Sequence, residues 1–178
     1  MKKLLLLLII ITTFSCCSND DDNTPTNPID QLPPATQTGA NTAGCLVNGN
    51  AFLPNNQSVQ PLVCNYLDGE VFTLGISRKD NDVYYKVYIY ISSSLEVGQT
   101  YHLNTEFGTN AKSGEYFINN EPSPSLNYYS TTPSITGELT ITHHDFNNAF
   151  LSGTFWFNAI NSNGEIIEVR EGRFDMDY

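Results

Sequence analysis

Hydrophobic and polar residues alternate along most of the chain from Gly44 onward. In segment 83–92 one face would carry Val83, Tyr85, Val87, Ile89 and Ile91. The opposite face would carry Tyr84, Lys86, Tyr88, Tyr90 and Ser92. Segments 135–142 and 151–159 alternate in the same way. Successive side chains of a strand point to opposite faces, so this pattern predicts half-buried antiparallel strands.

Turn-forming residues separate these segments. Asp68-Gly69, Asp80-Asn81-Asp82, the stretch 145–148 and Asn163-Gly164 are typical of tight connections between strands. A helical stripe of hydrophobic residues is not evident in any stretch of 12 residues. The pattern predicts a single all-β domain over residues 44–178, an antiparallel β-sandwich of about nine or ten strands. A closed lipocalin-like β-barrel is the alternative.

The N-terminus carries an export signal. Lys2 and Lys3 precede an apolar run from Leu4 to Ile11, which is too short to span a bilayer but fits the hydrophobic part of a secretory signal peptide. The small residue Ser15 followed by Cys16 resembles a bacterial lipobox, in which the cysteine is acylated and becomes the new N-terminus. We therefore expect residues 1–15 to be a lipoprotein signal peptide and Cys16 to be the lipidation site, with Cys17 as the alternative.

An acidic cluster, Asp20-Asp21-Asp22, follows the expected lipidation site. It resembles the export signal that directs lipoproteins of the Bacteroidota to the outer face of the outer membrane. The next residues are rich in Pro, Thr and Asn, and they contain few apolar side chains that could be buried. The sequence predicts a tether over residues 16–43 and an outer-membrane lipoprotein exposed at the cell surface and held by its acyl anchor.

The composition narrows the range of partners. The 178 residues carry 8 Lys and Arg against 19 Asp and Glu, giving a formal net charge of −11. Nucleic acid is excluded as a partner because binding to phosphate requires clustered basic residues. Two cysteines, Cys45 and Cys64, lie in the expected domain, and the oxidising compartment favours a disulfide between them.

Candidate catalytic and metal-binding groups are few. His143-His144-Asp145 is the densest polar cluster, but neighbouring strand residues diverge, so we interpret it as a strand end that runs into a turn. His143 continues the apolar phase of its strand. Asp80, Asn81 and Asp82 form an oxygen-rich turn without the spacing of a known calcium loop. We therefore predict no enzyme activity, no catalytic residues, no metal and no cofactor.

Aromatic residues are the most informative feature. They make up 12% of the chain, and Tyr84, Tyr88 and Tyr90 share the non-aliphatic face of one expected strand. Trp156 lies opposite Phe155 and Phe157 in another strand. Exposed aromatic rings suit stacking on sugar rings and also suit protein interfaces. Tyr84, Tyr88, Tyr90 and Trp156 are therefore the candidate binding face, unless a second layer buries them.

Several of these motifs occur together in a known family. They are the lipidated cysteine, the acidic run, the segment 44–49 (Gly-Cys-Leu-Val-Asn-Gly), Ile141-Thr142, the segment 152–155 (Ser-Gly-Thr-Phe) and the segment 171–175 (Glu-Gly-Arg-Phe-Asp). The chain resembles a family of small Bacteroidota lipoproteins classed as a domain of unknown function. The resemblance implies the cellular location and the fold class, and it supplies no catalytic residues.

Three functions fit the sequence. The first is a non-catalytic module at the cell surface that binds glycan or protein partners, for which a tether and a small β-domain are suited. The second is a lipocalin-like carrier of small apolar ligands. The third and least favoured is a hydrolase of surface polymers, which needs paired carboxylates in a cleft.

Overall fold

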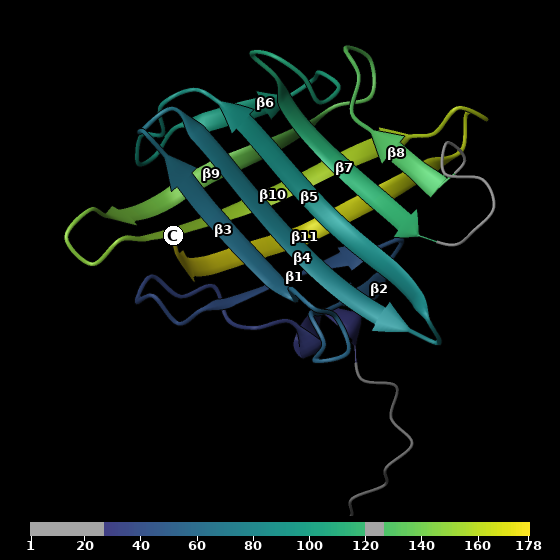
Figure 1. The fold of residues 1–178 in the computed structure, drawn as a ribbon, viewed down its shortest axis with the longest axis horizontal. Coiled ribbons are helices and arrows are strands. Elements are labelled where there is room, and N and C mark those ends of the chain that lie inside the picture. Colours follow the sequence, from purple (N-terminus) through teal and green to yellow (C-terminus); the bar gives the residue numbers. More distant parts are fainter. Residues whose placement is uncertain (1–26, 120–126) are drawn as a thin grey trace, which may run out of the picture.

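The computed structural model describes residues 27–119 and 127–178, and in them the chain folds into an antiparallel β-sandwich (Figure 1). The expected signal peptide (1–15), Cys16, Cys17 and the acidic run lie outside the described residues. Figure 1 shows two layers of strands that cross each other, which we call the front and back layers. The sheet is open, so the sandwich expected from the alternating pattern is the observed fold and the closed alternative is not.

Eleven strands and one short helix make up the fold of the described residues. The front layer contains, in spatial order, β3 (Leu62–Leu67), β4 (Val71–Asp80), β5 (Val83–Ser92), β7 (Lys112–Asn119) and β8 (Tyr128–Ser130). The back layer contains β2 (Asn50–Phe52), β1 (Thr42–Val47), β11 (Ile166–Asp177), β10 (Phe150–Ile160), β9 (Gly137–Asp145) and β6 (Thr100–Leu103). The 3-10 helix η1 (Pro28–Gln31) precedes β1. β10 joins the layers, since it pairs with β9 along most of its length and with β8 at Ile160.

The core fills the space between the two layers. β5 confirms the predicted alternation, because Val87, Ile89 and Ile91 are buried while the intervening tyrosines face outward. The ring of Phe157 on β10 packs against Gly114 on β7. A Cβ atom added to Gly114 would lie 2.7 Å from the Phe157 ring. Only a residue without a side chain leaves room for this ring, so Gly114 sets how closely the layers approach.

Tight turns connect neighbouring strands where the sequence predicts them. Residues 68–70 join β3 to β4, with φ angles of 53° at Asp68 and 71° at Gly69, and Asn81 and Asp82 join β4 to β5 with 48° and 67°. Positive φ at both central positions is the geometry whose twist matches that of antiparallel strands. Asn, Asp and Gly adopt this region most readily, which explains their use here.

The segment before β1 is folded onto the back layer. The buried carboxylate of Asp175, 1% exposed, accepts hydrogen bonds from side chains and from three consecutive backbone N–H groups. The donors are Thr36 Oγ1 at 2.7 Å, Thr38 N at 2.9 Å, Gly39 N at 2.9 Å, Ala40 N at 3.1 Å and Ser152 Oγ at 2.8 Å. Gly39 has a φ of 69°, and this turn lets the three N–H groups converge on one carboxylate.

The expected boundary of the tether at residue 43 therefore falls too late in the chain. Residues 27–43 include η1, and Leu32 is buried at 7% exposure. Their composition is that of a linker, but the segment gains its order from hydrogen bonds to a single carboxylate 135 to 139 residues away in sequence. A local pattern of hydrophobic residues does not contain this information.

We expect Asp175→Asn to lower the free energy of unfolding by at least about 2 kcal/mol, since hydrogen bonds to a buried charge contribute roughly 1.5–3 kcal/mol each. Burial raises the pKa of Asp175, but hydrogen bonds from Thr38, Thr36, Ser152 and Ala40 outweigh it and hold the pKa well below its usual range. The contribution is complete above the unfolded pKa of about 3.9 and is lost as the pH falls below it.

Urea unfolding at several pH values measures this effect. The difference between the wild type and Asp175→Asn should shrink as the pH drops below about 4. Asp177→Asn is the matched control, because Asp177 is exposed and accepts a side-chain hydrogen bond from Asn41 at 2.7 Å. Equal losses of stability in the two variants would contradict the assigned role of Asp175.

Candidate functional site

The four aromatic residues of the predicted binding face lie on two different surfaces. Tyr84, Tyr88 and Tyr90 point outward from β5 in the front layer and are half-buried. Trp156 points outward from β10 in the back layer and is 37% exposed. The structure therefore brings the tyrosines together and separates them from the tryptophan.

Tyr88 lines a pocket on the outer face of the front layer, which we call the Tyr88 pocket. Its volume is about 320 Å³. β5 and β7 pair side by side, so that Tyr88 lies opposite Glu115 and Lys86 lies opposite Phe117. The lining residues are Lys86, Tyr88, Phe107, Glu115 and Phe117. Three rings thus surround one acidic and one basic side chain.

Glu115 is an incompletely paired carboxylate in this pocket. It is 2% exposed, and its Oε1 accepts a hydrogen bond from Ser113 Oγ at 2.8 Å. Within the described part of the chain this is the hydrogen bond that the carboxylate accepts. Burial raises the pKa of Glu115, and the Ser113 hydrogen bond and the attraction of Lys86 only partly offset this. A nearly buried carboxylate with spare acceptor capacity is costly unless donors that enter the pocket, such as the hydroxyl groups of a ligand, satisfy it.

Lys86 lies flat across the front layer beside Tyr88. Its ammonium is 4.5 Å from the centroid of the Tyr88 ring, a cation–π distance. Gly75 of β4 gives it room, since a Cβ there would come within 3.0 Å of Lys86 Cε. Burial lowers the pKa of Lys86, and the Glu115 carboxylate acts in the opposite direction. The pocket therefore presents a donor and an acceptor between aromatic walls.

Further rings fix the walls of the pocket. Phe107, in the loop before β7, packs edge-to-face on Tyr90 with ring centroids 4.9 Å apart, and Phe117 packs on Tyr128 at 5.0 Å. Phe107 is 56% exposed, so it forms an outer rim. A polar ring-shaped ligand could stack on these faces while its hydroxyl groups donate to Glu115.

Sequence reasoning identified Tyr88 but missed Glu115, Phe107 and Phe117. Glu115 and Phe117 are two residues apart in a strand, so they lie on the same face, and this spacing can be read from the sequence. An isolated acid in a strand pattern is usually solvent-exposed, so the pattern alone does not reveal its burial. Phe107 lies in a loop, and only the fold brings it beside β5.

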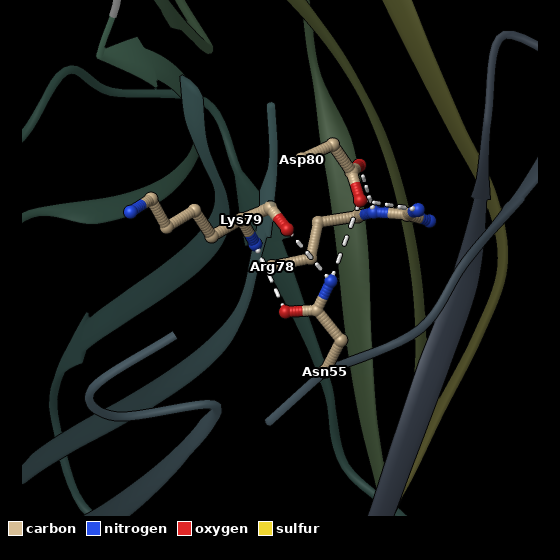
Figure 2. A network of polar contacts seen from close by, with 4 residues as sticks. All are labelled: Asn55, Arg78, Lys79 and Asp80. Atoms are coloured by element: carbon tan, nitrogen blue, oxygen red, sulfur yellow. Dashed lines mark hydrogen bonds and ion pairs between the residues drawn. The ribbon is translucent and has the colours of Figure 1, made fainter. Parts of the chain in front are cut away.

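The oxygen-rich turn at Asp80, Asn81 and Asp82 is engaged by the chain's own cations and by Asn55. Figure 2 shows Asp80 paired with Arg78, whose Nε donates at 2.6 Å and whose second guanidinium nitrogen donates at 3.0 Å. Asn55 bonds to Lys79 N at 3.0 Å and to Lys79 O at 2.9 Å, which ties the preceding loop to β4. Asp82 pairs with the Lys79 ammonium at 2.7 Å. In residues 27–119 and 127–178, no group of three His, Cys, Asp or Glu is placed to hold a metal ion.

His143 and His144 contact different aromatic groups. The pairing of β9 with β10 shifts register at Thr142, which is the extra residue of a β-bulge. Beyond this bulge the side chains of β9 point to the faces opposite to those expected from strict alternation. His144 therefore packs on Tyr66 of the facing β3 at 5.4 Å and bonds Tyr178 Oη at 2.9 Å, while His143 stacks on Phe150 at 5.1 Å. The expectation that His143 continues the apolar phase of the strand is wrong for this reason.

The two cysteines of the domain are free thiols in the structure, so the disulfide expected from the sequence is not formed there. Cys45 lies on β1 in the back layer, and Cys64 lies on β3 in the front layer. Burial raises the pKa of both thiols, that of Cys64 to about 12, with the nearby Asp177 carboxylate adding to the effect. Each thiol packs as part of the apolar core or against it.

We expect Glu115→Gln to raise the free energy of unfolding at pH 7 by on the order of 1 kcal/mol. Because the folded pKa of Glu115 is raised, its ionisation destabilises the folded state increasingly as the pH rises through that value. Glutamine keeps an acceptor for Ser113. Thermal unfolding from pH 4 to 8 measures the effect, with the exposed Glu70→Gln as the control. Loss of stability in Glu115→Gln at neutral pH would show that the carboxylate is structural.

Comparison with known proteins identifies a family but no individual relative. Neither the curated proteins nor the solved structures contain a match to this chain. Within the described residues, no helix is long and apolar enough to cross a membrane. Residues 66–176, which include all of β4 to β10, match a family described as "Domain of unknown function (DUF6252)". The chain belongs to this family.

Proposed function

We propose that this protein is a surface-anchored lipoprotein whose β-sandwich is a non-catalytic glycan-binding module, with the Tyr88 pocket as its binding site. One observation carries the proposal: Glu115 is 2% exposed as a residue, and its carboxylate lines a pocket with aromatic walls and retains an acceptor oxygen without a donor from the described residues. Such a carboxylate binds neighbouring hydroxyl groups of a sugar well.

The other lining groups support a sugar rather than an apolar ligand. Tyr88 and Phe117 offer ring faces for stacking, and the Lys86 ammonium can donate to ring or hydroxyl oxygens. A fatty acid would leave the Glu115 carboxylate buried beside apolar chain, which is unfavourable. The space between the layers is filled by core side chains such as Phe72 and Phe157, which weakens the proposal of a lipocalin-like carrier.

The absence of catalysis is part of the proposal. Glycoside hydrolysis uses two carboxylates about 5–10 Å apart on either side of the scissile bond. The carboxylate that lines the Tyr88 pocket is Glu115, and its hydrogen-bond partner is a serine. A protein partner stays the second candidate, because Tyr88 and the exposed Phe107 also suit a protein interface.

The cellular location rests on the sequence. The resemblance of Ser15-Cys16 to a lipobox and of Asp20–Asp22 to a Bacteroidota surface-export signal supports an acylated protein on the outer face of the outer membrane. Three carboxylates next to the lipid would be repelled by an anionic surface, so the chain would stand away from it. A binding module held at the surface in this way meets glycans outside the cell.

Binding to an array of immobilised bacterial, plant and mucin polysaccharides tests the pocket. We expect Tyr88→Ala to weaken binding at least about tenfold, which corresponds to roughly 1.4 kcal/mol and is typical of a lost stacking contact. Glu115→Gln should weaken it similarly while keeping or increasing stability. Tyr84→Ala is the matched control, since Tyr84 lies on the same strand face but outside the lining.

Unchanged binding in both Tyr88→Ala and Glu115→Gln would contradict the pocket as the glycan site. Binding to fatty-acid vesicles in place of every polysaccharide would favour the carrier instead.

Metabolic labelling with an alkyne-tagged fatty acid tests the anchor in the native host. We expect Cys16→Ser to abolish incorporation of label because the acylated thiol is removed, and Cys17→Ser to retain it. Protease treatment of intact cells should degrade the wild-type protein if it is exposed at the surface. Labelling that survives Cys16→Ser but disappears in Cys17→Ser would move the lipid site by one residue.

A further inference from the structure

A second hollow lies on the outer face of the back layer, around Trp156, and we call it the Trp156 groove. Its volume is about 560 Å³, larger than that of the Tyr88 pocket. Three neighbouring strands form its floor and one of its walls comes from the segment before β1. Its lining includes Glu138 and Thr140 of β9, Thr154 and Trp156 of β10, Arg170, Glu171 and Arg173 of β11, and Ala35 of the segment before β1.

A bulge in β11 forms the groove. The pairing of β10 with β11 shifts register around Trp156, and Glu171 adopts a positive φ of 53°. Gly172 follows, and a Cβ there would come within 2.4 Å of the Phe155 ring. This bulge adds a residue between Arg170 and Arg173, and both side chains line the groove. The segment containing Ala35 is held on the sheet by the hydrogen bonds from Thr36 and Thr38 to Asp175, which fix this wall of the groove.

Trp156 is held in one orientation although 37% of it is exposed. Its Nε1 donates to Glu138 Oε2 at 3.2 Å. The Arg170 guanidinium lies 5.6 Å from the ring centroid, and hydrogen bonds to Phe157 O at 3.1 Å and Asn158 Oδ1 at 2.6 Å hold it there. An indole fixed in this way loses little conformational entropy when a ligand stacks on it.

The charges of the groove are balanced. Glu138 and Glu171 contribute two carboxylates, and Arg170 and Arg173 contribute two guanidinium groups. Thr140 and Thr154 add hydroxyl groups next to the indole. A polyanion or a polycation would meet repulsion from half of these side chains, whereas a hydroxyl-rich chain can use donors and acceptors of both kinds.

We propose that the Trp156 groove is a second glycan site that binds a stretch of polysaccharide chain, on the layer opposite to the Tyr88 pocket. The class of ligand rests on the proposed function, but the groove shares no residue with the pocket. The pocket has the size for a terminal or branching sugar, and the open groove accepts a longer run of units. Two sites on opposite faces would let one domain contact two chains of a surface polymer.

The chain has one tryptophan, so its fluorescence reports directly on this groove. The full-length protein in detergent is titrated with barley β-glucan, xylan, yeast mannan, soluble starch, pectin and porcine gastric mucin. We expect at least one of these polymers to blue-shift the emission maximum, because a stacked sugar removes water from the exposed indole. The shift should persist in Tyr88→Ala.

Native electrophoresis in gels that contain the same polymers gives the second readout. We expect Trp156→Ala to weaken retardation about tenfold, and Thr154→Arg, which fills the groove from an exposed position, to weaken it similarly. Ile166→Ala is the control, since Ile166 is 50% exposed on the same strand as Arg170 but outside the lining.

The outcomes separate the two sites. If a polymer retards the wild type and Trp156→Ala equally and does not shift the emission, the result contradicts glycan binding in the Trp156 groove. It does not contradict binding in the Tyr88 pocket. Retardation that depends on Trp156 but not on Tyr88 supports the groove and contradicts the pocket. If no polymer shifts the emission or retards the protein, both glycan sites are overturned.

Discussion

The buried carboxylate of Asp175 holds together three parts of the chain that are far apart in sequence. Its six hydrogen bonds come from Thr36, Thr38, Gly39 and Ala40 in the N-terminal segment and from Ser152 on β10. The segment that it holds packs on the outer face of the back layer and contributes Ala35 to the lining of the groove around Trp156. Ser152 and Asp175 belong to two of the segments, 152–155 and 171–175, on which the family resemblance rests, and this contact joins them directly.

Asp175 and Glu115 are both almost fully buried acids, but their surroundings differ in kind. The hydrogen bonds that Asp175 accepts outweigh the effect of burial on its pKa, so the pKa is lowered. Glu115 has a single serine donor and the attraction of a lysine, and its pKa is raised. The first arrangement stabilises the folded state, and the second costs stability that hydrogen-bond donors entering the pocket can recover. This contrast is the physical reason for assigning a structural role to Asp175 and a binding role to Glu115.

Much of the fold followed from period-two alternation and turn residues. The faces of β5, the turns at Asp68-Gly69 and Asn81-Asp82, and the sandwich class were predictable because each depends on neighbouring residues. The order of residues 27–43 was not, since it depends on Asp175 at the other end of the chain. The bulge at Thr142 also escaped prediction, because a single extra residue reverses the phase without altering the composition.

The candidate site was only partly visible in the sequence. The shared face of Tyr84, Tyr88 and Tyr90 was predictable from one strand, whereas the separation of Trp156 from them required knowing which layer each strand joins. Glu115 became a candidate only when pairing of β5 with β7 placed it opposite Tyr88. Sites assembled from several strands depend on strand order, which alternation does not specify.

The most direct test of the Tyr88 pocket is an amide chemical-shift titration of the isotope-labelled full-length protein with oligosaccharides of the polymer that it retains best. The account predicts that the largest shifts cluster on β5 and β7 around Lys86, Tyr88, Glu115 and Phe117. A second cluster on β9 to β11 around Trp156 is consistent with it. Saturable shifts confined to other parts of the domain, with β5 and β7 unperturbed, would contradict it.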